Sequence, residues 1–126
     1  MRLRPATMKD ASLLYRWRND SESVANSFGS KPVRWPEHLR WLSRRIKDCQ
    51  PVYIFEFHDH PVGTVNIDGD ILSYTIAPES RGHGLGTLML ALVKDRHGPL
   101  KCQVKPDNVK SIKAATKAGH LVILDH

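Results

Sequence analysis

The sequence of 126 residues predicts a mixed α/β, or α+β, fold: a single central, mostly antiparallel sheet flanked by helices. Three observations predict it. Apolar, β-prone runs cluster in the middle of the chain; helix-like runs stand before and after them; and a helix-like run crosses to a further strand near the C-terminus. The length is near the common size of one domain, so we expect a single domain over residues 1–126.

The N-terminal half is expected to hold one strand and two helices. Residues 1–7 predict a short strand, and Thr7 is suited to cap a helix over Met8–Arg18. The segment Asn19–Lys31 is polar and rich in turn formers, which predicts a loop. Pro36 is typical of the first helical position and predicts a helix over Pro36–Asp48. The apolar spacing predicts that its buried stripe is Leu39, Leu42 and Ile46.

The rest of the chain is expected to complete the sheet and add two helices. Val52–Phe57 reads as a strand, and a hairpin follows in which Val62–Ile67 and Ile71–Ile76 flank an Asp-Gly turn. Asp107 or Asn108 is suited to cap the last helix, and Gly119 to end it. The remaining elements are expected over Thr87–His97 (helix), Leu100–Val104 (strand), residues 108–118 (helix) and Leu121–Leu124 (strand).

The composition and charge of the chain indicate which classes of partner to expect. The formal net charge is +6, from 19 basic and 13 acidic residues. A basic surface suits anionic ligands, but no basic stripe with stacking aromatics is evident, so nucleic acid is not expected as a partner. No run has the length of a transmembrane helix or signal peptide, which predicts a cytoplasmic protein without a membrane partner. Cys49 and Cys102 lack CxxC spacing and are expected to be free thiols.

The most informative feature is the run Arg81-Gly82-His83-Gly84-Leu85-Gly86, between an expected strand and an expected helix. Alternate glycines let backbone N–H groups point into one concavity, and a helix beginning there adds unsatisfied N–H groups and a positive dipole end. This predicts an anion cradle suited to a pyrophosphate, with a ligand-free tight turn as the alternative. The G-x-G-x-G spacing fits neither the dinucleotide fingerprint nor the P-loop.

Arg-x-x-Gly-x-Gly between a strand and a helix is the pyrophosphate-binding signature of the GCN5-related N-acetyltransferases (GNAT), which the chain resembles over essentially its whole length. The element order matches, and Pro78-Glu79-Ser80-Arg81-Gly82 looks like the family's approach to the cradle. Asn108-Val109-Lys110-Ser111-Ile112 resembles the later N-x-x-S-I segment, whose asparagine faces the pantetheine arm. The resemblance implies an acyl-CoA N-acyltransferase-like fold with acetyl-CoA as co-substrate.

The resemblance also implies which residues bind the co-substrate. The backbone from Arg81 to Thr87 would hold the pyrophosphate, with the Arg81 side chain adding charge. Free N–H groups at a splayed strand end near Ile76 and Ala77 would polarise the acetyl carbonyl. The residues expected to bind acetyl-CoA are therefore Ile76, Ala77, Arg81, Gly82, His83, Gly84, Leu85, Gly86, Thr87, Asn108 and Ser111.

The N-terminal half resembles the branch that acetylates nucleotide-linked 4-amino sugars, as in pseudaminic acid synthesis; this likeness rests on Leu13–Asp20, residues 26–28 and Glu37–Leu42. Asn19, Asn26 and Trp41 are expected to bind the acceptor, because amides suit sugar hydroxyls and tryptophan stacks on a sugar or base. A helix stop at Asn19 and core packing of Trp41 are the alternatives.

Direct attack by an amine needs a proton acceptor, and the leaving thiolate can take a proton. Glu37 and His38 are the expected acceptors, with a helix-start acid and a surface histidine as the alternative. Ala115 stands where many family members carry a tyrosine, so Tyr74 is the substitute donor unless the thiolate leaves unprotonated. His58 and His60 have no evident third ligand, so no metal is expected.

These expectations describe an acetyl-CoA-dependent N-acetyltransferase acting on a small-molecule primary amine, with an amino sugar or a nucleotide-linked amino sugar as the expected acceptor. The alternatives are a protein or peptide N-acetyltransferase of the ribosomal type and an inactive acyl-CoA-binding relative. Full-length relatives usually continue through a further strand after the last helix, so the resemblance implies a fold abridged at its C-terminus. An open sheet edge there predicts a homodimer as one way of covering it.

Overall fold

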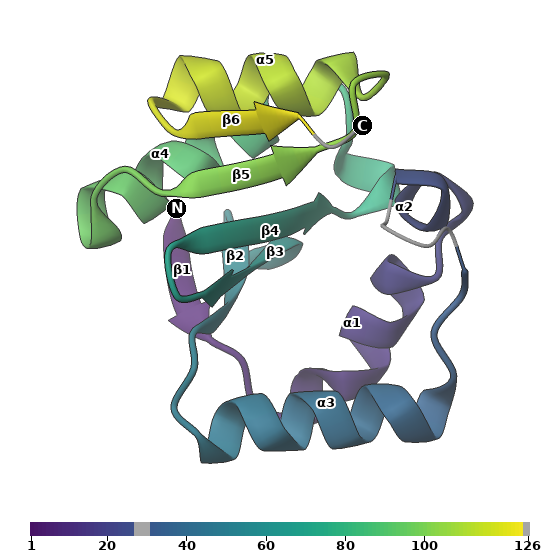
Figure 1. Cartoon of the computed structure of the whole chain (residues 1–126). Helices are drawn as coiled ribbons and strands as arrows, with labels where there is room; N and C mark the ends of the chain where they lie inside the picture. The colour runs from purple at the N-terminus through teal and green to yellow at the C-terminus, as the bar shows by residue number, and fades with distance from the viewer. Residues whose placement is uncertain (27–30, 125–126) are drawn as a thin grey trace.

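The computed structural model describes residues 1–26 and 31–124 (Figure 1). Its centre is a six-stranded sheet in which the strands lie side by side in chain order. The four N-terminal strands pair antiparallel, while β5 pairs parallel with β4 and β6 parallel with β5. The predicted single, mostly antiparallel sheet is confirmed. The strands are β1 (Arg2–Pro5), β2 (Val52–Phe57), β3 (His60–Asp68), β4 (Ile71–Ile76), β5 (Lys101–Val104) and β6 (Leu121–Leu124).

Helices cover both faces of the sheet. Helices α4 and α5 pack on one face, whereas α1 and α3 pack together on the other, where α1 also contacts β4 (Figure 1). Short 3-10 turns, Met8–Asp10 and Pro78–Ser80, precede α1 and the cradle. The α-helices are α1 (Ala11–Arg18), α2 (Ser21–Asn26), α3 (Trp35–Lys47), α4 (Leu85–His97) and α5 (Val109–Ala118).

Each face of the sheet has its own hydrophobic core. On the α4–α5 face, Val65 and Leu72 from the sheet pack in one cluster with Met89 and Leu90 of α4. On the α1–α3 face, the second cluster is built around Trp17, Leu42 and Ile54. Because both clusters hold fully buried side chains, the sheet is fixed from both sides.

Local chemistry explains the element ends. The Thr7 hydroxyl accepts a hydrogen bond from Lys9 N–H, and Asp10 accepts one from Thr7 N–H, so the expected N-cap is part of a capping box. Asn108 caps α5, and Gly119 ends it with φ of +92°. His58 and Asp59 have φ of +52° and +63°, so the turn before β3 is tighter than expected and the strand begins at His60.

Two predictions on the α1–α3 side are wrong. The segment expected as a loop contains α2, whose start is capped by the Asp20 carboxylate on Ser23 N–H. The buried stripe of α3 is His38, Leu42 and Arg45, whereas Ile46 is 37% exposed. Arg45 can be buried because its guanidinium donates to the carbonyl oxygen of Ile67, at 2.6 Å, and to the side chain of Gln50.

Among the described residues, no helix is both long enough and apolar enough to cross a membrane. Cys49 and Cys102 are free thiols, as expected. Strand β6 forms one edge of the sheet, and its Leu121 side chain is 59% exposed. The expected homodimer stays a prediction.

Candidate active site

The sheet opens between β4 and β5. The two strands pair only at Ile71–Lys101 and Leu72–Cys102, although β5 goes on pairing with β6 as far as Val104. Residues 73–76 of β4 therefore have no partner strand on that side. Figure 1 shows β4 and β5 side by side, with β6 on the far side of β5. The opening connects the α4–α5 face of the sheet with the α1–α3 face.

Backbone groups of β4 point into this opening. The Ala77 N–H donates to the carbonyl oxygen of Val62 at 2.8 Å, so the expectation of a free N–H is wrong at Ala77. Hydrogen-bonding direction alternates along a strand, and this bond sets the phase. The N–H and C=O groups of Tyr74 and Ile76 consequently face away from β3 and toward the opening.

A cavity of about 840 Å³ fills the opening and continues on both sides of the sheet. Its size is typical of a pocket for a small molecule or cofactor. Of the residues expected in the site, those that line it are Asn26, His38, Trp41, Tyr74, Ile76, Arg81, Gly82, Gly84, Leu85, Gly86, Thr87, Asn108 and Ser111. Those outside the lining are Asn19, Glu37, Ala77 and His83.

The glycine run forms the expected cradle at one end of the cavity. Gly82 and Gly84 have φ of +85° and +73°, which side chains rarely adopt, and open space surrounds both. Helix α4 begins at Leu85 with no side-chain cap. The first-turn N–H groups therefore lack acceptors in the helix and are free for an anion. Unpaired donors and a positive dipole end at the cavity wall fit a pyrophosphate.

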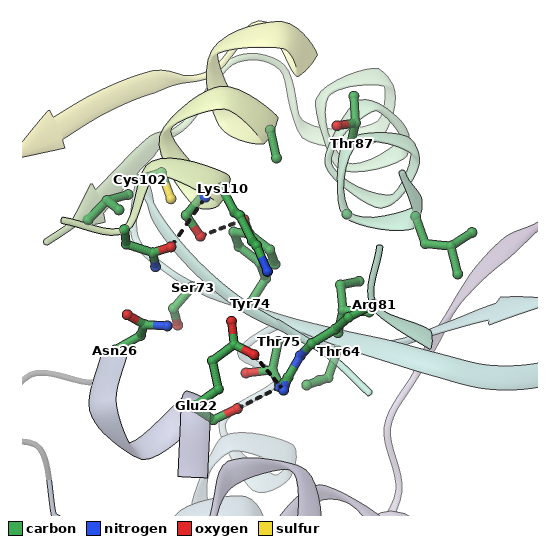
Figure 2. A pocket seen from close by; sticks show the side chains of 18 of the residues that line it. Glu22, Asn26, Thr64, Ser73, Tyr74, Thr75, Arg81, Thr87, Cys102 and Lys110 are labelled. Carbon is green, nitrogen blue, oxygen red and sulfur yellow. Dashed lines mark hydrogen bonds and ion pairs between the residues drawn. The ribbon is translucent and has the colours of Figure 1, made fainter. Parts of the chain in front are cut away.

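Arg81 lies differently from the expectation. Its guanidinium donates to the Asp20 carboxylate at 2.7 Å, to Glu22 at 3.1 Å and to the Ser23 hydroxyl at 3.1 Å. Figure 2 shows Glu22 and Arg81 turned toward one another. Arg81 lowers the pKa of Asp20, against the weaker opposing effect of burial. The side chain thus ties α2 to the cradle, and the charge it carries is already partly neutralised.

Tyr74 and the late-helix segment meet on the α4–α5 side. The Asn108 side-chain oxygen accepts from Ser111 N–H at 3.3 Å, and the Ser111 hydroxyl lies 2.6 Å from the Tyr74 hydroxyl. Burial raises the pKa of Tyr74, while the bond with Ser111 opposes the rise. The phenol is therefore protonated at neutral pH, as a proton donor must be.

The two expected proton acceptors, Glu37 and His38, lie in different environments. Glu37 is exposed, while His38 is fully buried within an aromatic cluster with Tyr15, Trp35 and Trp41. His38 Nε2 lies 2.9 Å from the carbonyl oxygen of Ala11, so it must carry the hydrogen, and Nδ1 keeps a lone pair. Nδ1 has no hydrogen-bond partner within the described part of the chain. Burial lowers the pKa of His38, so its neutral form prevails at pH 7.

Of the residues expected to bind the acetyl acceptor, some line the cavity and one does not. Asn19 donates from its amide to the carbonyl oxygen of Val33 at 2.8 Å and accepts from Val33 N–H at 2.7 Å. It therefore fixes the segment before α3 rather than facing the cavity. Asn26, at the end of α2, and Trp41, on α3, both line the cavity, and His38 and Trp41 stack at 6.0 Å between ring centroids.

A polar floor, formed by Thr64, Asn66, Ser73 and Thr75, was missed in the sequence. These residues belong to two cross-strand pairs, so all four share the sheet face toward α1 and α3. All line the cavity, and Figure 2 shows the side chains of Thr64, Ser73 and Thr75 there. The signal was present in the sequence: polar and apolar residues alternate along both strands of the predicted hairpin, which gives an antiparallel sheet one polar face.

Basic side chains were missed too. Arg18, in the last turn of α1, lines the acceptor end of the cavity, and its guanidinium carbon lies 4.8 Å from the Trp41 ring centroid. Lys110, Lys113 and Lys117 line the cavity from α5, at spacings that keep them near one helix face. Within residues 1–26 and 31–124, no group of three or more His, Cys, Asp or Glu side chains is placed to hold a metal ion.

Comparison with solved structures shows the same fold in several acetyltransferases. A spermidine N-acetyltransferase from Vibrio cholerae, in complex with CoA and spermine, has a TM-score of 0.78 at 16% identity, over 94% of this chain and 79% of that chain. A ribosomal-protein-alanine N-acetyltransferase from Brucella melitensis has a TM-score of 0.72 at 24% identity, over 94% and 83%. The aminoglycoside acetyltransferase AAC(6')-Ib, in complex with coenzyme A, has a TM-score of 0.73 at 25% identity, over 93% and 82%.

A comparison with curated protein sequences gave no match. The model of the acetyltransferase (GNAT) domain family, in contrast, matches residues 1–120, which is nearly the whole chain. The splayed strands, the glycine cradle at the start of α4 and the Asn108 segment all lie within that match. The chain therefore belongs to the GNAT acetyltransferase family.

Proposed function

We propose that the chain transfers the acetyl group of acetyl-CoA to the primary amine of a small molecule, an amino sugar or a nucleotide-linked amino sugar. The observation that carries this is the cavity itself. It begins at the unpaired N–H groups of α4, passes the opening between β4 and β5, and ends on the polar floor under α1 and α3. A donor and an acceptor bound at its two ends would meet where the strands separate.

The donor end fits acetyl-CoA, which supplies an acetyl group activated as a thioester. The first-turn N–H groups of α4 would bind its pyrophosphate, and the positive φ of Gly82 and Gly84 turns the backbone into that position. The lysines of α5 add positive charge along the same wall. Ile76 N–H, which faces the opening, would polarise the acetyl carbonyl.

The acceptor end supplies a proton acceptor. An ammonium must lose a proton before its nitrogen can attack, and His38 is neutral with a lone pair on Nδ1. We assign the role to His38 rather than Glu37, because His38 belongs to the cavity lining and Glu37 does not. Its bond to the Ala11 carbonyl fixes the tautomer that leaves Nδ1 free. Since Nδ1 is itself buried, a water molecule would carry the proton from the amine to it.

The leaving thiolate can take a proton, and we propose Tyr74 as the donor. Its hydroxyl lies in the cavity on the donor side and is joined to the Ser111 hydroxyl at 2.6 Å. After transfer, Ser111 can relay a proton from solvent to the tyrosinate, accepting one proton as it donates the other, because a hydroxyl both donates and accepts. Tyr74 and Ser111 would thus replace the tyrosine whose place is taken by Ala115.

Two measurements test the proposal. Acetyl-CoA should raise the melting temperature of the purified protein, since a ligand that binds the folded state alone stabilises it by about 2.7 kcal/mol at a hundredfold excess over Kd. Thiol release should then depend on an added amine, with amino sugars preferred to peptides bearing an N-terminal alanine. Binding without thiol release for any amine would indicate an acyl-CoA-binding protein, and preference for the peptides would indicate a protein acetyltransferase.

A further inference from the structure

The charges that face the cavity are unbalanced. The basic side chains in its lining are Arg18, Arg81, Lys110, Lys113 and Lys117, whereas Glu22 is the acidic residue among the described lining residues. Glu22 is itself paired with Arg81 at 3.1 Å, and Asp20 pairs with the same guanidinium at 2.7 Å. Both carboxylates are therefore paired with Arg81, and the remaining positive charge of the lining is carried by Arg18 and the three lysines of α5.

Arg18 is the cation at the acceptor end, and it is unpaired. No carboxylate of the described part of the chain lies within ion-pair distance of its guanidinium, which instead lies over the Trp41 ring at 4.8 Å. A cation–π contact uses the charge but none of the N–H donors. The donors of Arg18 remain free for a ligand in the cavity.

The surroundings of Arg18 are built for a polar, uncharged group beside an anion. The polar floor supplies hydroxyls and an amide, Asn26 supplies another amide from α2, and Trp41 supplies a flat apolar face. An acceptor with several ammonium groups would need carboxylates to offset its desolvation. The lining supplies a single carboxylate, and that carboxylate is paired with Arg81.

On the basis of the transfer reaction proposed above, we propose that the acceptor carries an anionic group in addition to its amine. This group is either a phosphate or a carboxylate, and Arg18 binds it above the Trp41 ring. The reacting amine lies on the polar floor nearer the opening. The same arrangement rejects polycations such as aminoglycosides and polyamines, because Arg18 repels them and free carboxylates are lacking in the described lining. Arg18 thus determines specificity and takes no part in the chemistry.

The test compares amines that differ in charge. Steady-state thiol release from acetyl-CoA is measured with glucosamine 6-phosphate, muramic acid, glucosamine, kanamycin and spermidine. The phosphate and carboxylate sugars should exceed glucosamine in kcat/KM by about tenfold or more, because hydrogen bonds to charged groups contribute roughly 1.5–3 kcal/mol. Kanamycin and spermidine should be the poorest. The better of the two anionic sugars distinguishes a phosphate from a carboxylate.

Variants assign the preference to Arg18. In Arg18→Gln the kcat/KM ratio of anionic sugar to glucosamine should fall toward one, and Arg18→Lys should restore part of it. Arg16→Gln is the matched control: it removes the same charge from the same helix, at an exposed side chain outside the cavity lining, and it should keep the wild-type ratio. A ratio that survives in Arg18→Gln, or kanamycin or spermidine turned over as well as the anionic sugars, would overturn the proposal.

If no amine in the panel is turned over, binding affinities test the preference for anionic acceptors instead. Each amine is titrated calorimetrically into the CoA-saturated protein, and the anionic sugars should bind more tightly than glucosamine in the wild type and in Arg16→Gln but not in Arg18→Gln. Equal affinities would overturn the proposal. Acetyl-CoA is titrated first: if it does not bind, the proposed function itself fails, whereas binding without a preference for anions refutes the acceptor class alone.

Discussion

Three glycine-to-alanine variants separate the folding role of the cradle from its binding role. Gly84 has φ of +73°, and a Cβ there would meet nothing within 4 Å. Gly84→Ala should therefore cost only backbone strain, about 1–2 kcal/mol for a left-handed residue. Gly86 lacks this strain, and its Cβ would lie 3.7 Å from Ile76 and from Tyr74, an ordinary contact. Gly86→Ala should leave stability unchanged or raise it, since alanine favours a helix by up to about 1 kcal/mol.

The matched control is Gly69→Ala. Gly69 lies in the turn between β3 and β4 with φ of +63°, nothing within 4 Å and no place in the cavity lining. Thermal unfolding should show Gly69→Ala and Gly84→Ala melting lower than wild type by similar amounts, roughly 3–10 °C for a domain of this size. Gly86→Ala should melt at or above the wild-type temperature.

Acetyl-CoA binding should rank the same variants differently. Gly84→Ala and Gly86→Ala both change the wall that is proposed to approach the pyrophosphate, and each should weaken binding about tenfold, or about 1.4 kcal/mol. Gly69→Ala should bind as the wild type does. Calorimetric titration measures these affinities. Wild-type affinity in Gly86→Ala would refute the close approach of the ligand to the first turn of α4, and unchanged melting of Gly84→Ala would refute the left-handed conformation.

Three further predictions follow from the site. Tyr74→Phe should lower kcat about tenfold to a hundredfold with little change in KM or melting temperature, as expected for loss of a proton donor; an unchanged kcat would mean that the thiolate leaves unprotonated. The lowered pKa of His38 implies stability that is full above about pH 6.5 and lost as the pH falls through the folded-state value, because the unfolded state binds the proton first. The melting temperature of His38→Gln should therefore depend less on pH between 7.5 and 5.5, and an identical dependence would contradict the assignment. Arg81→Gln should loosen α2, seen as faster amide hydrogen exchange over Ser21–Asn26, while exchange in α5 stays unchanged.

Much of the fold was predictable because its signals are local. The alternation and the Asp-Gly turn identify the β3–β4 hairpin, and the boundary of α3 follows from Pro36. The cradle was predictable for the same reason, since its glycines set the backbone without help from distant residues. The positive φ of Gly82 and Gly84 is the structural counterpart of that pattern.

The predictions that proved wrong concern features that depend on contacts between residues far apart in the sequence. Helix α2 is short and polar, and it is held by Arg81, which lies 61 positions after Asp20 in the chain. The burial of Arg45 depends on the Ile67 carbonyl oxygen, which no local pattern announces. The missed parts of the site also depend on distant contacts. The polar floor forms only when β3 and β4 pair in register, and the position of Arg18 in the cavity depends on its contact with Trp41 on another helix.

Binding of the acetyl-CoA pyrophosphate by the cradle can be isolated by titrating the protein with acetyl-CoA and with acetyl-pantetheine, which has the same thioester and arm but no pyrophosphate. If the cradle binds as described, acetyl-CoA should bind at one site per chain, and acetyl-pantetheine should bind about a hundredfold more weakly or worse, a difference of at least roughly 2.7 kcal/mol. Equal affinities for the two compounds, or no binding of acetyl-CoA, would contradict this role of the cradle.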